Sequence, residues 1–348
     1  MLSLMEAGAA SLFLAILFTP ALIRALRRRD FGQRIREEGP PTHIVKAGVP
    51  TMGGILIVLA AIFGYLVGHL GGYRTFTRSG VLVLLLVVAC GVLGLADDLI
   101  GVRSDRNLGL NKRTKFLVQV LIAVGFAVAA WKWAGATTAL SFTRYNLPSW
   151  HLAPAAWIAF AAFVVVATSN AVNLTDGLDG LAAGSSTLCF SVLAVIGYWQ
   201  FRHYPIYRVG SYPPTALDLA LVSVALVGGC LGFLWWNAPP ARIIMGDTGS
   251  LSIGAGIAGL CLLMNLDLLL VVIGGLFVIE TLSVIAQVIS FRVFHRRVLR
   301  LAPLHHHFEM LGWPETTVLI RFWIIAGLCC ALGIGIVFGD YAKTTGVL

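Results

Sequence analysis

The chain has 348 residues, of which 58% are hydrophobic and 12% are charged, and its formal net charge is +9. Soluble domains carry roughly a quarter charged residues, so this composition excludes an ordinary soluble globular protein. The positive charge alone does not indicate a nucleic-acid partner, because the basic residues flank apolar segments and no nucleic-acid-binding motif accompanies them.

Apolar segments of about 20 residues predict membrane-spanning helices, because a helix of that length crosses a hydrocarbon core of about 30 Å. Ten such segments are expected, at residues 4–23, 51–70, 79–96, 115–134, 155–172, 183–201, 217–236, 248–266, 268–290 and 318–339. The first is expected to be a retained span, since no basic region precedes it and arginines follow it. The six cysteines lie in apolar segments without metal-ligand spacing, which predicts neither a disulfide nor a metal site. The sequence therefore predicts an all-α polytopic membrane protein, with one domain over residues 1–348.

The distribution of positive charge predicts how these helices are oriented. The connections at residues 24–50, 97–115, 173–182, 237–247 and 291–317 carry 17 of the 25 Lys and Arg residues. Connections rich in Lys and Arg stay on the cytoplasmic side of a membrane. Both termini are therefore expected outside the cytoplasm, and anionic lipids and substrates are the expected partners.

Five polar segments fall on the predicted cytoplasmic side, close to the ends of spans. They are Asp97-Asp98, Asn170 to Gly180, Asn237, Met245 to Ser250, and Pro303 to Glu309. Each has an ordinary explanation, because Asp caps helices, Asp and Gly form turns, and adjacent His residues can be a chance tract. Adjacent carboxylates also favour a nearby cation, and an acid with hydroxyls at a helix start suits a metal or a phosphate. Their convergence on one face predicts an active-site cleft that faces the cytoplasm.

Two lysines accompany these segments. Lys46 precedes the second span and Lys115 opens the fourth, and either can be a simple flanking charge. Carboxylates that hold Mg²⁺, together with cations that offset phosphate charge, are what phosphoryl transfer requires. The absence of a Gly-x-x-x-x-Gly-Lys sequence disfavours an ATPase of that type. These features together favour phosphoryl transfer at the membrane face.

Five motifs carry a resemblance to a known family. They are Pro50-Thr51-Met52-Gly53-Gly54, Asp97-Asp98-Leu99, the segment from Asn173 to Ala182, the segment from Met245 to Leu251, and the segment from Ala302 to Glu309. In combination they resemble the phospho-N-acetylmuramoyl-pentapeptide transferases, over the chain from about Thr19 to the tenth span. The aspartate and glycine motifs are shared by the wider polyprenyl-phosphate N-acetylhexosamine-1-phosphate transferase superfamily, and the three-histidine loop is typical of the muramoyl-pentapeptide branch.

The resemblance implies an enzyme of the bacterial cell membrane that converts UDP-MurNAc-pentapeptide and undecaprenyl phosphate to lipid I and UMP. It implies ten helices with the ninth broken, for which Gly274-Gly275 is the candidate point, and also a homodimer and Mg²⁺ dependence. Asp247 is implied as the principal Mg²⁺ ligand, with Asp97 and Asp98 nearby. The other residues implied as catalytic are Lys46, His305 and His306. Positions that match substrate or inhibitor contacts are Thr51, Lys115, Asn173, Asp176, Gly177, Leu178, Asp179, Asn237, Ile244, Gln287 and His307.

One departure and two alternatives remain. The family commonly has Phe where this chain has Ile244, and an aliphatic side chain lacks the aromatic quadrupole that stacks on uracil. A superfamily relative that transfers GlcNAc-1-phosphate is the nearest alternative. A transporter or flippase would suit ten spans with the intramembrane Glu280, but that residue is equally explained as a packed, hydrogen-bonded side chain.

Overall fold

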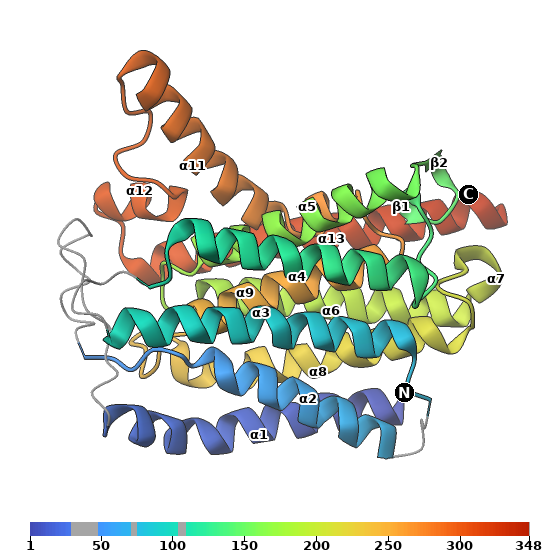
Figure 1. Ribbon diagram of the computed structural model, residues 1–348, viewed down its shortest axis with the longest axis horizontal. Coiled ribbons are helices and arrows are strands. Elements are labelled where there is room, and N and C mark those ends of the chain that lie inside the picture. The colour runs from blue at the N-terminus through green and yellow to red at the C-terminus, as the bar shows by residue number, and fades with distance from the viewer. Residues whose placement is uncertain (29–47, 71–74, 104–108, 348) are drawn as a thin grey trace.

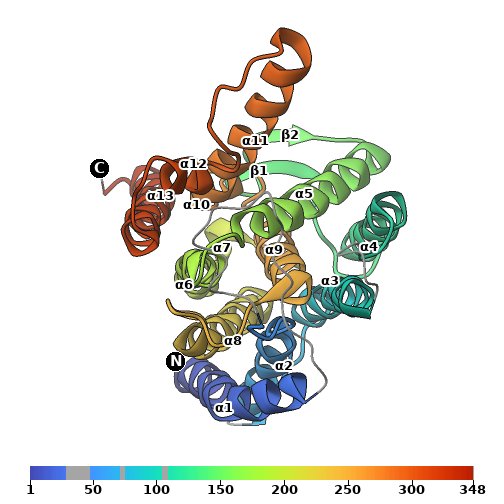
Figure 2. The same ribbon diagram turned by 90° about the vertical axis from the view of Figure 1, so that its left-hand side faces the viewer.

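The computed structural model describes residues 1–28, 48–70, 75–103 and 109–347. Long helices lie side by side in a bundle (Figure 1), and Figure 2 shows the same bundle end-on. The longer helices are α1 (Leu2–Arg27), α2 (Gly54–Leu70), α3 (Arg78–Arg103), α4 (Lys112–Lys132), α5 (Pro154–Thr175), α6 (Leu181–Arg202), α8 (Pro214–Asn237), α9 (Gly246–Leu263), α11 (Gly275–Phe294) and α13 (Glu315–Thr345). Three short helices are α7 (Tyr204–Tyr207), α10 (Leu270–Ile273) and α12 (Leu304–Met310).

The long helices are those of a multi-pass membrane protein. Among the described residues, nine of them have at least 18 residues and are apolar enough to cross a membrane. The helix α2 is apolar as well, but it has 17 residues. The ten expected spans correspond in order to these helices, and α2 is the one that falls short in length.

The expected ninth span is divided in two. The helix α10 ends at Ile273, Gly274 lies between the two helices, and α11 starts at Gly275. The break at Gly274-Gly275 is therefore confirmed. Beyond it, α11 extends away from the rest of the bundle in both views (Figures 1 and 2).

The helix α9 lies in the interior of the bundle and is almost entirely buried. It packs mainly against α3 and α5. Small residues allow this close approach, and Gly94 of α3 is the clearest case, because a Cβ at this position would collide with the backbone carbonyl of Asp247. Close packing through small residues is the usual way in which helices associate within a membrane. The first turn of α9 is thereby fixed against the end of α3.

A small β-hairpin departs from the all-α expectation. Strands β1 (Ala139–Arg144) and β2 (Leu147–His151) pair antiparallel between α4 and α5. Residues along β1 are alternately buried and partly exposed, which is the two-residue period of a strand packed on one face. Arg144 contacts the Asp340 carboxylate of α13 at 3.0 Å, and Asp267 accepts a hydrogen bond from Ser141 N at 3.0 Å. These partners are distant in sequence, so the strand was not evident from the sequence.

The two termini lie at the same end of the bundle (Figure 1), as an even number of spans requires. The hairpin also lies at this end, where β1 contacts α13. The polar ends of α3, α5 and α9 and the helix α12 lie at the opposite end. That opposite end contains the candidate site.

Candidate active site

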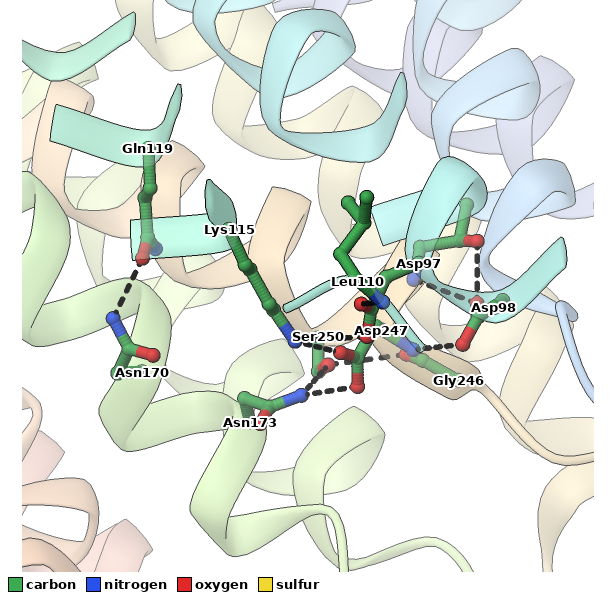
Figure 3. A network of polar contacts seen from close by, with 11 residues as sticks. Asp97, Asp98, Leu110, Lys115, Gln119, Asn170, Asn173, Gly246, Asp247 and Ser250 are labelled. Carbon is green, nitrogen blue, oxygen red and sulfur yellow. Dashed lines mark hydrogen bonds and ion pairs between the residues drawn. The ribbon is translucent and has the colours of Figure 1, made fainter. Parts of the chain in front are cut away.

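Asp247, in the first turn of α9, is at the centre of a polar network (Figure 3). One carboxylate oxygen, Oδ1, accepts a hydrogen bond from Asn173 Nδ2 at 2.7 Å. The other contacts the ammonium group of Lys115. The same Lys115 Nζ lies 3.1 Å from Asp97 Oδ2, at the end of α3. One lysine of α4 therefore joins carboxylates from two other helices.

Both oxygens of Asp97 have a partner. While Oδ2 contacts Lys115, Oδ1 accepts a hydrogen bond from the backbone N–H of Leu110 at 2.7 Å. Leu110 lies just before α4, where the Asn111 side chain caps the helix by accepting from Arg113 N. The carboxylate of Asp97 therefore fixes the start of α4, and with it the position of Lys115.

Asp98 caps the start of α9 from the neighbouring helix α3. Its Oδ1 accepts from Asp247 N at 3.0 Å, and its Oδ2 accepts from Thr248 N at 3.0 Å and from Thr248 Oγ1 at 2.7 Å. Gly246 has a φ of +73°, which favours glycine, and a Cβ there would lie 2.6 Å from Asp98 Oδ2. A carboxylate satisfies the free N–H groups of a helix start and complements the helix dipole. Asp98 therefore positions Asp247.

The segment before α2 forms one edge of the site. Ile244 N donates to Pro50 O at 2.8 Å, and Gly53 N donates to Ile244 O at 2.9 Å. This pairing places Thr51 beside Gly246, since a Cβ on that glycine would lie 3.0 Å from Thr51 Oγ1. Ile244 is partly exposed at the same edge. Lys46 lies outside the described residues.

The turn after α5 is held by side chains from two segments. Gly180 N donates to Asn237 Oδ1 at 3.0 Å, and Asn237 Nδ2 donates to Ile243 O at 2.9 Å. Asp179 Oδ2 accepts from Ala241 N at 3.0 Å. Asp179 and Asn237 are both buried, so in this structure they hold the turn against the segment that leads into α9.

Within the same turn, the side chains of Asp176 and Leu178 have different surroundings. Leu178 is 3% exposed and packs in a hydrophobic cluster with Val318 and Phe322 of α13. Asp176 and Gly177 remain partly exposed. Within this turn, the side chain of Leu178 is therefore part of the packed interior, whereas Asp176 lies at the surface.

The three histidines occupy three different environments. His305 is completely buried, and its Nδ1 lies 3.2 Å from Glu280 Oε1 of α11. Its ring packs against Gly177 so closely that a Cβ there has no room. His306 is partly exposed, and its Nδ1 is 2.6 Å from Glu309 Oε2. Glu280 is also buried, and its Oε2 accepts a hydrogen bond from Leu304 N at 2.9 Å, so the description of Glu280 as a packed, hydrogen-bonded side chain is confirmed.

His307 and Gln287 contact the loop between α11 and α12. His307 Nδ1 accepts from Arg300 N at 3.1 Å. Gln287 Oε1 accepts from Val298 N and Leu299 N, at 3.1 and 2.9 Å, and its Nε2 donates to Leu299 O at 3.1 Å. Both the oxygen and the nitrogen of the Gln287 side-chain amide therefore form hydrogen bonds that hold the loop in shape.

The contacts connect all five polar segments, so the predicted convergence is confirmed. Asp98 contacts the start of α9, Asn173 contacts Asp247, Asn237 holds the turn after α5, and the histidine loop packs against that turn. Several partners were not identified from the sequence: Leu110, Thr248, Ser250 and Gln119. Thr248 and Ser250 lie within a recognised motif, whereas the contribution of Leu110 is a backbone N–H and has no sequence signal.

Among the described residues, no group of three or more His, Cys, Asp or Glu side chains is gathered as a metal site. The donors near Lys115 are nevertheless hard oxygens, from two carboxylates on different helices. Mg²⁺ is commonly held by one or two protein carboxylates, with water and substrate phosphate oxygens completing its shell. The chemistry of these donors fits such an ion.

Comparisons with known proteins identify relatives over nearly the whole chain. A protein-family model described as glycosyl transferase family 4 matches residues 80–265. The phospho-N-acetylmuramoyl-pentapeptide-transferase of Mycobacterium leprae (strain TN) is 47% identical, with 99% of this chain and 100% of the relative covered. The enzyme of the same name from Frankia casuarinae is 46% identical, with 98% of each chain covered. That from Streptomyces griseus is 44% identical, with 98% of this chain and 99% of the relative covered.

Proposed function

Because the chain belongs to the phospho-N-acetylmuramoyl-pentapeptide transferases, within glycosyl transferase family 4, we propose that it catalyses the reaction which that name describes. It transfers phospho-MurNAc-pentapeptide from UDP-MurNAc-pentapeptide to undecaprenyl phosphate, and the products are lipid I and UMP. The observation that carries the proposal is the network of Asp97, Lys115 and Asp247 at one end of a membrane bundle. It supports the proposal because it combines both kinds of charge that phosphoryl transfer needs, carboxylates and a cation.

The proposal includes the orientation and the assembly. The end that carries the network faces the cytoplasm and both termini face outward, which is supported by the 17 of 25 Lys and Arg residues in the connections that the sequence assigns to the cytoplasmic side. The helix α2 also crosses the membrane and brings the number of spans to ten, because 17 residues extend over about 26 Å and cross most of the hydrocarbon core. By the family resemblance, the enzyme acts as a homodimer in the cell membrane.

Asp247 and Asp97 would hold Mg²⁺. Their Oδ2 atoms both contact one cationic group, Lys115 Nζ, which supports a common point where positive charge is favoured. Asp247 would be the principal ligand, since Asp98 already accepts three hydrogen bonds from the start of α9. When bound, Mg²⁺ supplies positive charge to the pyrophosphate oxygens of the nucleotide.

In the reaction, an oxygen of the lipid phosphate attacks the phosphorus that carries the sugar. The bond from that phosphorus to the bridging oxygen breaks, and UMP leaves with this oxygen and the electron pair. A phosphate monoester has a second pKa near 6, so at neutral pH most of the lipid phosphate has no proton to lose. Asp97 uses both oxygens to hold Leu110 N and Lys115, and its proposed role is therefore to organise the site.

Cations offset the negative charge that two phosphorylated substrates bring together. Lys115, which the structure describes, is proposed to offset this charge. Lys46 is proposed as a second cation. Asn173 and Asp176 are proposed to contact the nucleotide, and Thr51 and Ile244 to form its edge. The positions of these four residues support their proposed roles, because each residue lies on or beside the segments around Asp247.

The remaining predicted site residues are proposed to shape the binding surface. Asp179 and Asn237 hold the turn after α5, and Gln287 and His307 hold the loop after α11. His305 is buried, so its proposed role is to support that turn at Gly177, with His306 at the surface beside it. Through these contacts the loop between α11 and α12 is tied to the nucleotide side of the site.

The test is release of UMP by the purified full chain in detergent. We expect UMP from UDP-MurNAc-pentapeptide and undecaprenyl phosphate, no UMP from UDP-GlcNAc, and no turnover when EDTA removes Mg²⁺. Asp247→Asn should lower the rate by at least about 10³-fold, because loss of one strong electrostatic group in a phosphoryl-transfer site has effects of that order.

Asp340→Asn is the matched control, since this carboxylate is also in an ion pair but lies at the opposite end, against β1. It should leave the rate within about twofold of wild type. UMP released from UDP-GlcNAc would change the proposed substrate, and full turnover in EDTA would remove the metal from the proposal.

A further inference from the structure

A second polar contact joins α4 and α5, one helix turn away from the network around Asp247 (Figure 3). Gln119 Oε1 of α4 accepts a hydrogen bond from Asn170 Nδ2 of α5 at 2.9 Å. Gln119 follows Lys115 by four residues and Asn170 precedes Asn173 by three, so each pair lies on one face of its helix. The faces of α4 and α5 that carry Lys115 and Asn173 therefore also carry this contact.

The orientation of both amides is fixed by a backbone carbonyl. Asn170 Nδ2 also donates to Val166 O at 2.8 Å, and a carbonyl oxygen can only accept. The amide nitrogen of Asn170 is therefore the atom that meets Gln119. Gln119 has to present its oxygen to this nitrogen, since two amide nitrogens would both be donors. The contact thus depends on an acceptor at position 119.

Gln119 does not reach the surface of the site. It is 1% exposed, and it is the polar member of the buried residues of α4, the others being Ala123, Phe126, Ala127 and Ala130. Apolar packing is non-directional and allows small shifts of a helix, whereas a hydrogen bond weakens steeply as its distance and angle change. Gln119 therefore fixes α4 along α5 more closely than its apolar neighbours can.

Lys115 lies between two points at which α4 is held. At its start, Asp97 accepts a hydrogen bond from Leu110 N. One such point leaves the tilt and the rotation of a helix open, and the hydrogen bond of Gln119, one turn beyond Lys115, supplies the second point. The opposite side of α4 adds little restraint, because its apolar residues are more than half exposed: Phe116, Leu117 and Leu121.

We propose that Gln119 is a positioning residue for the transfer reaction. Through Asn170 it sets how α4 lies against α5. It thereby keeps the ammonium group of Lys115 in contact with Asp247. The inference rests on the proposed function and adds to it a residue that the substrates do not touch. A displacement of about 1 Å can lower a rate by up to about 10²-fold, so a small shift of Lys115 is enough to slow transfer.

Stability alone does not account for a glutamine at this position. The Nε2 atom of Gln119 is buried and has no hydrogen-bond partner among the described residues. A buried donor without a partner destabilises a fold, and a side chain of similar length without that donor would avoid the loss. The amide is therefore explained by the residue that its oxygen holds.

The experiment measures UMP release by the purified full chain in detergent, for wild type and for Gln119→Met. Methionine is of similar length but offers Asn170 only a weak acceptor. We expect kcat to fall about tenfold, with KM for both substrates within about twofold of wild type, since Gln119 does not reach the surface of the site. The apparent Tm should stay within about 2 °C of wild type, because the lost hydrogen bond and the removed unpaired donor offset each other.

Gln200→Met is the matched control. Gln200 is also completely buried within a helix, α6, and its Nε2 donates to Met264 O at 2.9 Å. Its other amide atom, Oε1, likewise has no partner in the part of the chain that the structure describes. It lies near the end of α6 that is remote from the turn after α5. The kcat of this variant should stay within about twofold of wild type.

Asn170→Leu tests whether Gln119 acts through Asn170. When Asn170 is already leucine, the change Gln119→Met should lower kcat by less than about twofold further. A further tenfold loss in that background would overturn the inference, because Gln119 would then act by another route. Gln119→Leu also removes the acceptor, and it decides the matter if the methionine variant does not fold.

An unchanged kcat in Gln119→Met, with wild type active, would overturn the inference and leave the proposed function intact. A raised KM at an unchanged kcat would overturn it as well, and would assign Gln119 to substrate binding. A fall in the apparent Tm of more than about 4 °C would show that Gln119 supports the fold in general. A wild type that releases no UMP from UDP-MurNAc-pentapeptide would instead remove the proposed function, and this inference with it.

Discussion

Asp98→Asn separates a helix-capping role from a role in the reaction. In the wild type, Oδ1 accepts from Asp247 N, and Oδ2 accepts from both Thr248 N and Thr248 Oγ1. Asparagine has one accepting oxygen and one donating NH₂ group. In either orientation of the amide, a backbone N–H at the start of α9 faces a donor and loses its partner.

The expected loss of stability follows from these contacts. A hydrogen bond to a charged group contributes about 1.5–3 kcal/mol, and a negative charge at a helix start contributes about 0.3–1 kcal/mol. Together they give a loss of roughly 2–4 kcal/mol in the free energy of unfolding. At about 2 °C per kcal/mol for a chain of this size, the apparent Tm should fall by about 4–8 °C. The measurement is thermal denaturation of the detergent-purified protein, followed by tryptophan fluorescence.

Asp97→Asn provides the comparison. Its remaining oxygen can still accept from Leu110 N, and Lys115 keeps its contact with Asp247, so the apparent Tm should change by less than about 2 °C. UMP release should fall in both variants, because Asp98 positions Asp247 and Asp97 positions Lys115. An Asp98→Asn protein that unfolds at the wild-type temperature but has lost its activity would refute the capping role and return Asp98 to the metal or substrate.

Three further predictions concern Asp97, Ile244 and Asp267. Asp97→Asn should lower the rate of UMP release by a similar factor, roughly 10²-fold, at pH 6.5 and at pH 8.5, because Asp97 organises Lys115. A rate that recovers at the higher pH would indicate that Asp97 acts as a general base. Ile244→Phe should tighten a uridine-containing inhibitor about fivefold through stacking, and an unchanged inhibition constant would contradict this. Burial raises the pKa of Asp267 well above its usual range, and the hydrogen bond from Ser141 N offsets this only in part. The unfolded carboxyl ionises near pH 4 while the folded one stays protonated, so its contribution to stability is lost as pH rises towards the raised pKa. The apparent Tm of wild type should therefore fall more between pH 5 and pH 9 than that of Asp267→Asn, and parallel profiles would show that folding does not raise the pKa of Asp267.

The sequence was sufficient to identify the membrane helices and the polar end of the bundle. Long apolar segments have few stable arrangements in a membrane, because every backbone polar group has to be satisfied within a helix or a closed barrel. The grouping of the five polar segments was also predictable, since the alternation of loops follows from the number of spans, whereas the break at Gly274-Gly275 was expected from the family resemblance. The hairpin was not, because β1 depends on contacts with Asp267 and Asp340, which are far from it in sequence.

The tertiary structure decided what each polar residue of the site does. Asp97 and Asp98 are adjacent in sequence, but Asp98 caps α9 while Asp97 holds Lys115 and Leu110. His305 was predicted among the catalytic residues, and the fold buries it beside Glu280. The sequence specifies which donors and acceptors exist and on which helix ends they lie. Their roles depend on which partners the packed helices bring within about 3 Å, since hydrogen bonds and ion pairs act only over such distances.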